Sequence, residues 1–495
     1  MRPIYNIDMT TPKLIVSVAH GDGIGPEIMD AVLQVFNAAE VPLTYEKIGM
    51  GKSYYDQGFG NGMTPEAMES IERNGVLFKG PMETPKGKGV KSINVTARKV
   101  WSTYANRRHF RTINGVETVY SKAGIPIDIT IVRENIEDTY GGIEHMLSND
   151  VALSRRFITR QGCEQVIRFA FEMAKKEGFS KVTCGHKANI MKLTDGLFLE
   201  VFYNIAKEYP TIHSEDVIVD ALCMKLVQSP EEFEVVVLTN LQGDIVSDLC
   251  AGLVGGLGFA PSTNVGDNIS IFEAVHGTAP DIAGKNIANP TSLLMSGIMM
   301  LRHMGLLKYA NVIEGSLMYT LENGYHTGDF GDRASKSLNT SEFVDVIISN
   351  LGKGPSETPL RKTEQDIIPF RKPQRPLHQK VMHGNPSEKH IEGVDLFFQS
   401  DLRADELAPS IQALLPQGIT LISLTNRGTV VWPEGSVYTE CSTGYGARLK
   451  GSKCSKEDFW KVAAILNSII DVASTEFLNV IDGKRSYSLG QGQIG

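Results

Sequence analysis

The stretch Leu14–Ala39, LIVSVAHGDGIGPEIMDAVLQVFNAA, decides the class of fold. It opens with apolar residues rich in β-branched side chains, which predicts a buried strand at Leu14–Ala19. Residues Pro26–Ala39 then repeat apolar side chains at helical spacing behind a proline, which predicts a helix. The glycines between them resemble a dinucleotide-binding fingerprint, but Pro26 occupies the last required glycine position and lacks the N–H donor. We therefore expect a tight strand-to-helix turn and no Rossmann phosphate site.

The alternation of strand and helix patterns continues to about residue 350. Further strands are expected at Gly75–Phe78, Ile127–Arg133, Lys181–Cys184, Val217–Asp220, Val235–Thr239 and Ile269–Glu273. Further helices are expected at Gly162–Lys176, Leu193–Lys207, Asp244–Leu257 and Pro290–Met304. Strands that alternate with helices predict an α/β protein with a largely parallel sheet.

The amino-acid composition changes between residues 352 and 390, where frequent prolines and charged residues predict a linker. Beyond it, strands are expected at Val394–Gln399, Ile419–Ser423, Thr429–Trp432, Tyr438–Thr443 and Glu476–Ile481, with helices at Ala404–Leu415 and Lys456–Ala473. This order predicts a compact βαββαβ domain over residues 391–495.

Composition argues against several classes of protein. The 495 residues suffice for about three domains, and a net charge of −8 without a basic block argues against nucleic acid as a partner. No apolar run is long enough to cross a membrane, and the first residues lack the pattern of a secretory or transit peptide. The 6 cysteines are scattered and form no CxxC pair, which indicates reduced thiols and a cytoplasmic location.

Asp244 and Asp248 are separated by one helical turn and so share a helix face. Two anions stacked in this way repel each other unless a cation or water relieves them, and oxygen ligands suit Mg²⁺ or Mn²⁺. A carboxylate pair that interacts only with the helix dipole fits the spacing equally well. Spacing alone therefore leaves a divalent-metal site and a structural pair open.

Ser92, Asn94 and Arg98 lie in one short segment, and Arg108 and Arg133 follow it. Guanidinium groups bind carboxylates in a bidentate manner, so three arginines in one pocket would indicate a polycarboxylate ligand. Arginines that only keep the surface soluble are the alternative, because the sequence does not place these residues in space.

Tyr140 lies in the glycine-rich segment EDTYGGIEH, and Lys187 follows the strand expected at Lys181–Cys184. A lysine and a tyrosine near a metal can divide the roles of base and acid if their pKa values are lowered. A structural tyrosine is the alternative. The small residues of His276–Asp281 would let backbone N–H groups approach a ligand, although an ordinary turn has the same composition.

Taken together, these segments resemble those of a known enzyme family. The chain contains, in the family's order, GDGIGPE, KGPMETP, KSINVTARK, VRENIEDTYGGIEH, HKANIMK, NLQGDIVSDL, GGLGFAP and EAVHGTAPDIAGKNIANP. It resembles the β-decarboxylating dehydrogenases, the isocitrate/isopropylmalate dehydrogenase family, over about residues 13–350, and the later region resembles the C-terminal extension of the long bacterial subtype. The resemblance implies a mixed sheet flanked by helices. It also implies a large domain at 1–104 and 252–351 and a small domain at 105–251, with a clasp at about 138–163.

The resemblance implies oxidative decarboxylation of isocitrate to 2-oxoglutarate, with a dinucleotide and Mg²⁺ or Mn²⁺, in a homodimer or higher oligomer with shared sites. The catalytic residues would be Tyr140, which protonates C3, together with the partner subunit's Lys187 and the partner subunit's Asp220. The substrate-binding residues would be Ser92, Asn94, Arg98, Arg108 and Arg133, and the metal ligands Asp220, Asp244 and Asp248. The cofactor-binding residues would be Glu83, Thr84, Glu273, His276, Gly277, Thr278, Ala279, Asp281, Ile282 and Asn289.

Two residues of the cofactor segment predict NAD as the coenzyme. Relatives that use NADP usually carry Lys and Tyr where this chain has Asp281 and Ile282. A carboxylate accepts hydrogen bonds from both hydroxyls of the adenosine ribose but repels a 2′-phosphate. Arg333 argues against this prediction, because an arginine near the cofactor would bind the 2′-phosphate of NADP.

Two alternatives to this function remain. A 3-isopropylmalate or homoisocitrate dehydrogenase would need an apolar wall or another arginine where this chain has Ser92 and Asn94. A non-catalytic regulatory subunit would be expected to lose Tyr140, Lys187 or a metal-binding aspartate, and this chain keeps them all.

Overall fold

The computed structural model describes residues 14–83, 92–330, 337–356 and 387–489. The chain divides into two compact units. The first contains residues 1–140, 157–190 and 195–380, and the second contains residues 141–156, 191–194 and 381–495. None of the helices in the described ranges is long and apolar enough to cross a membrane.

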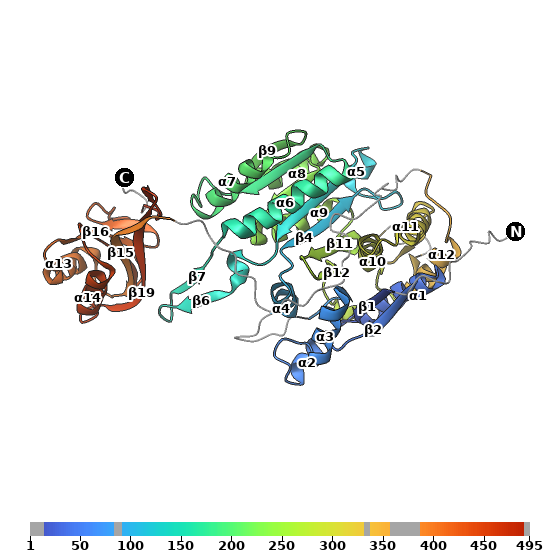
Figure 1. The fold of residues 1–495 in the computed structure, drawn as a ribbon, viewed down its shortest axis with the longest axis horizontal. Helices are drawn as coiled ribbons and strands as arrows, with labels where there is room; N and C mark the ends of the chain where they lie inside the picture. Colours follow the sequence, from blue (N-terminus) through green and yellow to red (C-terminus); the bar gives the residue numbers. More distant parts are fainter. Residues whose placement is uncertain (1–13, 84–91, 331–336, 357–386, 490–495) are drawn as a thin grey trace. The chain divides into compact units, whose positions relative to one another are not determined.

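A ten-stranded mixed sheet organises the first unit (Figure 1). Its strands are, in spatial order, β2 (Leu43–Lys47), β1 (Leu14–Ala19), β3 (Val76–Lys79), β12 (Ser270–Ala274), β11 (Pro261–Val265), β4 (Ala105–Arg111), β5 (Asp128–Glu134), β10 (Val235–Leu238), β8 (Lys181–His186) and β9 (His213–Ile218). The strands at each end of this order pair in parallel. The mixed sheet implied by the family resemblance is thereby confirmed.

Helices cover this sheet. Their bounds are α1 (Gly25–Ala38), α2 (Lys52–Asp56), α3 (Pro65–Asn74), α4 (Ile93–Val100), α5 (Val119–Lys122), α6 (Arg160–Glu177), α7 (Thr194–Ala206), α8 (Val219–Gln228), α9 (Asn240–Leu253), α10 (Thr291–His303), α11 (Leu307–Glu322) and α12 (Thr340–Ser349). The short elements are η1 (Asp138–Gly141), η2 (Pro230–Glu232), η3 (Leu257–Phe259), η4 (Pro280–Ile282), β13 (His326–Thr327) and β14 (Ser337–Leu338).

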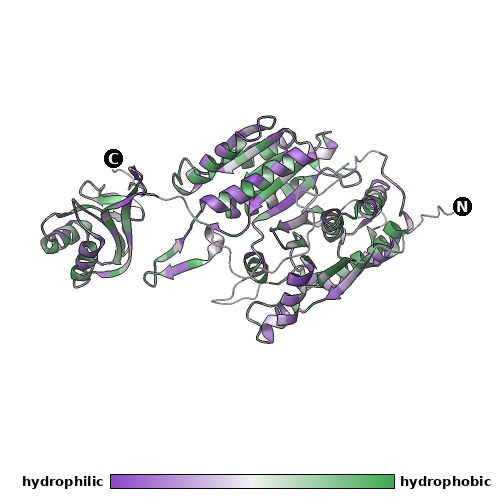
Figure 2. Cartoon of the chain, in the orientation of Figure 1, coloured by the Kyte–Doolittle hydropathy of each residue, from purple (hydrophilic) through white to green (hydrophobic). Residues whose placement is uncertain are grey.

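Separate apolar clusters fix the helices on the sheet. One joins α1, α10, α11 and α12 to the β1 side of the sheet around Phe36, and another joins α6 and α7 to β8 and β10 around Phe171. A third lies between α8, α9 and β5 around Leu222. In Figure 2 helix α6 alternates apolar and polar residues, as expected for a helix with one buried face.

Three expectations from the residue pattern are corrected. The sheet is not largely parallel, because β11 runs antiparallel to β12 and β4, and β4 runs antiparallel to β5. Asp220 lies in the first turn of α8 and not in a strand, because β9 ends at Ile218. Helix α9 begins at Asn240, so Asp244 lies one turn inside the helix. Alternating polarity reports which residues are buried, but it does not report strand direction or the first residue of a helix.

The glycine-rich turn after β1 has a packing role. Gly23 has a φ of 59°, and a Cβ there would lie 2.0 Å from the carbonyl oxygen of Thr278. The backbone N–H of Ile24 donates to that same oxygen at 2.9 Å. The turn therefore needs glycine so that the loop after β12 can approach, in agreement with the expected strand-to-helix turn.

The second unit contains a six-stranded antiparallel sheet with two helices. The strands are, in spatial order, β17 (Thr429–Trp432), β16 (Ile419–Asn426), β18 (Gly444–Gly451), β15 (Lys389–Gln399), β19 (Asp471–Ile481) and β20 (Lys484–Arg485). The helices are α13 (Ala404–Leu414) and α14 (Lys456–Leu466), and a hairpin of β6 (Ile143–Met146) and β7 (Ala152–Arg155) belongs to the same unit. The expected C-terminal domain is confirmed as an antiparallel sheet with two helices, but its order along the chain is βαβββαββ, which has one strand more between the helices and one more at the end than the expected βαββαβ pattern.

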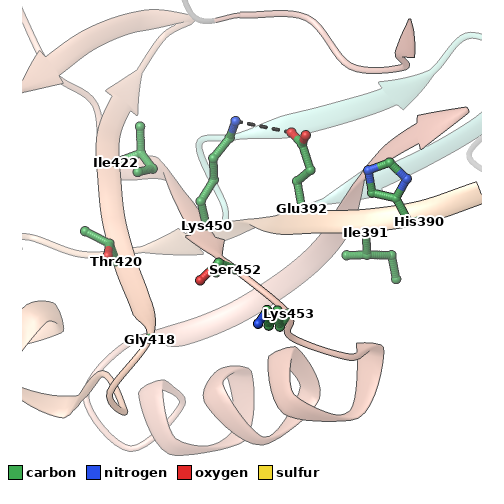
Figure 3. A pocket seen from close by; sticks show the side chains of 10 residues that line it. His390, Ile391, Glu392, Gly418, Thr420, Ile422, Lys450, Ser452 and Lys453 are labelled. Carbon is green, nitrogen blue, oxygen red and sulfur yellow. Dashed lines mark hydrogen bonds and ion pairs between the residues drawn. The ribbon is translucent and has the colours of Figure 1, made fainter. Parts of the chain in front are cut away.

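Two boundaries in this unit differ from the expected ones. Residues Tyr438–Thr443 form no strand, and α14 ends at Leu466, so that Asp471 already begins β19. A hollow of about 540 Å³ lies on this sheet between β15, β16 and the end of β18 (Figure 3). Lys450 and Glu392 form an ion pair at 3.3 Å in its wall.

Candidate active site

Arg133 lies near the C-terminal end of β5 and is 1% exposed. Its Nε and Nη2 donate to Oδ1 of Asn240 at 3.0 and 2.8 Å, and its Nη1 forms an ion pair with Asp244. Helix α9 approaches this side chain so closely that a Cβ on Gly243 would lie 2.7 Å from Cγ of Arg133. A glycine at this position therefore lets the guanidinium contact the first turns of α9.

Arg108, on neighbouring β4, reaches the same helix. Its Nη2 lies 3.4 Å from Oδ1 of Asp244, its Nη1 lies 3.4 Å from Oδ1 of Asp248, and Nη1 also donates to Oγ of Ser247 at 2.7 Å. Its Nε donates to Asn106 at 2.8 Å. Because Asp244 and Asp248 face the same guanidinium, the predicted sharing of one helix face is confirmed.

Arg98, on α4, joins this group through a buried ion pair. Its Nη2 lies 2.9 Å from Glu273, and Nζ of Lys79 lies 2.5 Å from the same carboxylate. Burial alone would raise the pKa of Glu273, but Lys79 and Arg98 together hold it far below its ordinary range. Asn264 also donates to Glu273, at 2.7 Å, which extends the network towards Asn106.

These contacts concentrate positive charge. Burial, together with the neighbouring Arg108 and Arg98, lowers the pKa of Arg133 to about 10. Burial also lowers the pKa of Arg108, against the opposing effect of Asp244. Three guanidiniums packed in this way disfavour one another unless anions compensate. Asp244, Asp248 and Glu273 supply part of that compensation, and the carboxylates of a ligand suit the same guanidiniums.

Two buried polar atoms on helix α4 make no hydrogen bond with described residues: Oδ1 of Asn94 and Nε of Arg98. Ser92 is the N-cap residue of the same helix. Buried polar groups without partners are costly, so they indicate a place where a ligand supplies the missing hydrogen bonds. The three arginines expected to share a pocket lie near enough to lower one another's pKa. Asn94 lies on the same helix as Arg98.

Tyr140, in η1, completes this cluster. Its hydroxyl donates to Asp244, and the Arg133 guanidinium lies 4.8 Å from the centre of its ring. The residue-based hypothesis required a lowered pKa, but burial and the hydrogen bond to Asp244 raise the pKa of Tyr140. The phenol therefore stays protonated at neutral pH, which suits a proton donor.

Asp244 is the residue on which these contacts converge. Burial would raise its pKa, but Arg133, the Tyr140 hydroxyl and Arg108 together lower it. The Asp248 side chain is 60% exposed and thus accessible to a ligand from solvent. Asp244 is therefore ionised at neutral pH, with Asp248 one turn further along the same face.

Lys187 and Asp220 form a separate pair. Lys187 follows β8, Asp220 begins α8, and the two side chains make an ion pair at the surface. The hydrogen bond from Lys187 lowers the pKa of Asp220. No group of three His, Cys, Asp or Glu side chains in the described ranges is placed to hold a metal, so Asp220 does not join Asp244 and Asp248 within one chain.

The residues predicted to bind the cofactor lie mainly in the loop after β12. His276 is half-buried, its Nδ1 contacts the Gly277 carbonyl at 3.0 Å, and its Nε2 has no partner among the described residues. Burial lowers the pKa of His276. Ala279 adopts a left-handed φ of 38°, and Asp281 is exposed.

The other predicted cofactor residues are spread more widely. Asn289 is buried and donates to Asp329 at 3.1 Å, and the Glu83 backbone N–H donates to Asp22 at 2.9 Å. Thr84 lies outside the described residues. Glu273 differs from this group, because its described contacts are with the network of Arg98 and Lys79.

Sequence reasoning missed several residues that build the site. Lys79, Asn106, Asn240 and Asn264 hold the arginines and Glu273 in place. Their signal in the sequence was weak, because isolated asparagines and a lysine at the end of a strand have many roles. The polar residues within the strands β3, β4 and β11 were the available signal, since buried polar side chains need partners.

This fold and site define a class of protein: an α/β protein without a Rossmann fingerprint, with buried arginines facing two aspartates at the end of a mixed sheet. The chain belongs to the isocitrate/isopropylmalate dehydrogenase family, which it matches over residues 15–347. Residues 389–493 match the C-terminal domain of bacterial isocitrate dehydrogenase.

Known proteins resemble this chain over most of its length. It is 43% identical to an isocitrate dehydrogenase [NADP] of Thermus thermophilus, over 97% of this chain and 96% of that protein. It is 46% identical to a probable mitochondrial isocitrate dehydrogenase [NAD] subunit alpha of Drosophila melanogaster, over 68% of this chain and 87% of that protein. A crystal structure of a Thermus thermophilus protein has a TM-score of 0.90 at 41% identity, covering 97% of this chain and 96% of that one.

The prediction of NAD is wrong. The relatives that match over 97% of this chain are named as NADP enzymes. The prediction rested on the repulsion between Asp281 and a 2′-phosphate, but Asp281 is exposed. Water and salt screen an exposed charge, so the repulsion is on the order of 1 kcal/mol, which cations elsewhere can outweigh. Arg333, the cation singled out in the sequence, lies outside the described residues.

Proposed function

We propose that this chain catalyses the oxidative decarboxylation of isocitrate to 2-oxoglutarate with NADP. The observation that carries the proposal is the convergence of Arg98, Arg108 and Arg133 near Asp244, with Tyr140 donating to that aspartate. A tricarboxylate neutralises the guanidiniums, and the names of the full-length relatives support both the substrate and the coenzyme.

The chain's own residues bind and orient the substrate. The guanidiniums of Arg98, Arg108 and Arg133 hold its carboxylates, and Ser92 and Asn94 meet its remaining polar groups. The Ser92 hydroxyl and the side-chain NH₂ group of Asn94 donate hydrogen bonds to the third carboxylate of isocitrate, whereas the isopropyl group of 3-isopropylmalate accepts no hydrogen bond from either donor. This choice of partners favours isocitrate over 3-isopropylmalate.

The carboxylate oxygens of Asp244 and Asp248 are the type of ligand that Mg²⁺ and Mn²⁺ prefer. Both side chains lie on one helix face, and Asp248 is open to solvent. We expect a third carboxylate from the partner subunit's Asp220, since one chain supplies only two. A divalent cation bound there supplies positive charge that stabilises the negative charge developing during decarboxylation.

Side chains of the protein also move the protons. Tyr140 keeps its proton at neutral pH and gives it to C3 of the product, while the partner subunit's Lys187 and the partner subunit's Asp220 take the proton of the C2 hydroxyl. NADP, held by the loop at 276–282 and by Asn289, supplies the hydride acceptor. His276 Nε2, which has no described partner, is a polar contact available to it.

A non-catalytic regulatory subunit is the alternative of a different class. Tyr140, Asp244 and Asp248 are all present and positioned, which favours the catalytic function.

The test is an assay of the purified chain with isocitrate, with NADP and NAD in turn, and with or without Mg²⁺ and Mn²⁺. We expect turnover that requires a divalent cation, with the higher kcat/KM for NADP. Absence of turnover under all these conditions would contradict the proposed function, and turnover in the presence of a chelator would contradict the metal site.

A further inference from the structure

Asp138 is a buried carboxylate that the proposed reaction does not use. It lies two residues before Tyr140 in η1, and its side chain is 0% exposed. Its backbone has a φ of 68°, in the left-handed region that residues other than glycine rarely adopt. Both the buried charge and this backbone conformation are unfavourable unless the surroundings compensate for them.

The compensation comes from backbone N–H groups. Oδ2 of Asp138 accepts the N–H of Leu241 at 3.0 Å, and Oδ1 accepts the N–H of Thr139 at 2.8 Å. Leu241 lies in the first turn of α9, where N–H groups lack partners within the helix. By accepting the N–H of Leu241, Asp138 caps α9 from another segment of the chain.

Tyr140 contacts the same helix one turn later. Its hydroxyl donates to Asp244, three residues after Leu241, and Nδ2 of Asn240 donates to the Glu137 carbonyl at 3.3 Å. The segment before Tyr140 is therefore attached to the start of α9 at two points. A shift of this attachment would move the phenol relative to the arginines.

We propose that Asp138 is the positioning residue of Tyr140: its carboxylate caps α9 and so fixes where the phenol delivers its proton. The inference rests on the proposed function, because Tyr140 is a proton donor only in that reaction. Asp138 makes no contact with the substrate in this account and acts only through Tyr140.

The first test is Asp138→Asn in the full-length protein. An amide of the same shape places an NH₂ group against one of the two N–H donors, so one of these hydrogen bonds is lost. We expect kcat with isocitrate and NADP to fall about 10²-fold, as a displacement of about 1 Å would produce, with KM for isocitrate within about three-fold.

The same change is then made in a Tyr140→Phe background. If Asp138 acts through Tyr140, adding Asp138→Asn to the Tyr140→Phe variant lowers kcat by less than about two-fold, because the phenol hydroxyl that Asp138 positions is already absent. An undiminished effect of Asp138→Asn in this background would overturn the proposal. A structural role alone would produce that undiminished effect.

Glu234→Gln is the matched control. Its carboxylate also accepts two backbone N–H groups, from Ser180 at 2.7 Å and Lys181 at 2.8 Å, beside the opposite end of β10. We expect this variant to keep wild-type kcat even if its unfolding temperature falls. A loss of kcat in Glu234→Gln like that in Asp138→Asn would also overturn the proposal.

Asp138→Gly is the second variant, because glycine adopts the left-handed backbone freely and removes only the carboxylate. Wild-type kcat in either Asp138 variant overturns the proposal, and so does the failure of both variants to fold, which would make the carboxylate structural. Wild-type protein that does not oxidise isocitrate overturns the proposed function instead, so the two failures are distinct.

Discussion

At the scale of single residues, Tyr140 carries the clearest chemical assignment. Burial and Asp244 keep its phenol protonated, so removal of the hydroxyl removes the proton donor. We predict that Tyr140→Phe lowers kcat about 10²-fold or more and changes KM for isocitrate little, measured by steady-state kinetics. Tyr120→Phe is the control, because its hydroxyl donates to the Val227 carbonyl at 2.9 Å on the surface. Full activity of Tyr140→Phe would remove this residue from the mechanism.

Glu134, at the end of β5, predicts a pH dependence of stability. Burial raises its pKa from 4.5 to about 7, against the hydrogen bonds from the Ile136 and Glu137 backbone. Between pH 4.5 and about 7 the Glu134 carboxyl loses its proton in the unfolded chain but keeps it in the folded chain. The free energy of unfolding therefore falls as pH rises through this range.

We predict that Glu134→Gln removes this dependence. The free energy of unfolding of the wild type should fall relative to the variant by about 3 kcal/mol between pH 4.5 and 7, and stay parallel to it above pH 7. Urea unfolding of both proteins across this range measures the difference. A difference that does not change with pH, or that changes in the opposite direction, would show that Glu134 titrates normally in the folded state.

At the scale of elements, α9 offers a comparison between two of its own glycines. A Cβ on Gly243 would meet Arg133, whereas a Cβ on Gly252 would meet nothing within 4 Å. We predict that Gly243→Ala displaces Arg133 and lowers kcat/KM for isocitrate about ten-fold or more. Gly252→Ala should keep kcat/KM and stabilise the protein by up to about 1 kcal/mol. Equal kinetics for the two variants would contradict the close packing of α9 on Arg133.

The elements also show what sequence could predict. The strand Leu14–Ala19 and the start of the helix at Lys456 were predicted to the residue, because β-branched runs and capping residues act locally. Asp220 was placed in a strand because the residue pattern before it is apolar, although a helix begins at Val219. The antiparallel centre of the sheet depends on pairings between distant segments, which local patterns do not encode.

The candidate site was predictable to a similar extent. The motif around Arg98 and the aspartates of α9 pointed to a polyanion site, and the structure places them near one another. The raised pKa of Tyr140 and the supporting asparagines could not be predicted, because burial and hydrogen bonding follow from the tertiary fold.

At the scale of the whole molecule, the proposed function requires two chains to complete each site. Lys187 and Asp220 form an exposed pair that we assign to the partner's site. We predict that mixed subunits carrying Lys187→Met or Tyr140→Phe, each nearly inactive alone, regain about a quarter of wild-type activity after joint refolding, because half of random dimers hold one intact site. Activity no higher than that of the separate variants would show that each chain carries a whole site.

A comparison of two substrates on the wild-type protein tests the proposed function. The polar groups of Ser92 and Asn94 beside three arginines should bind a third carboxylate and disfavour an isopropyl group. With NADP and Mg²⁺, we predict that kcat/KM for isocitrate exceeds that for 3-isopropylmalate by about 10²-fold or more. An equal or higher kcat/KM for 3-isopropylmalate would contradict the account.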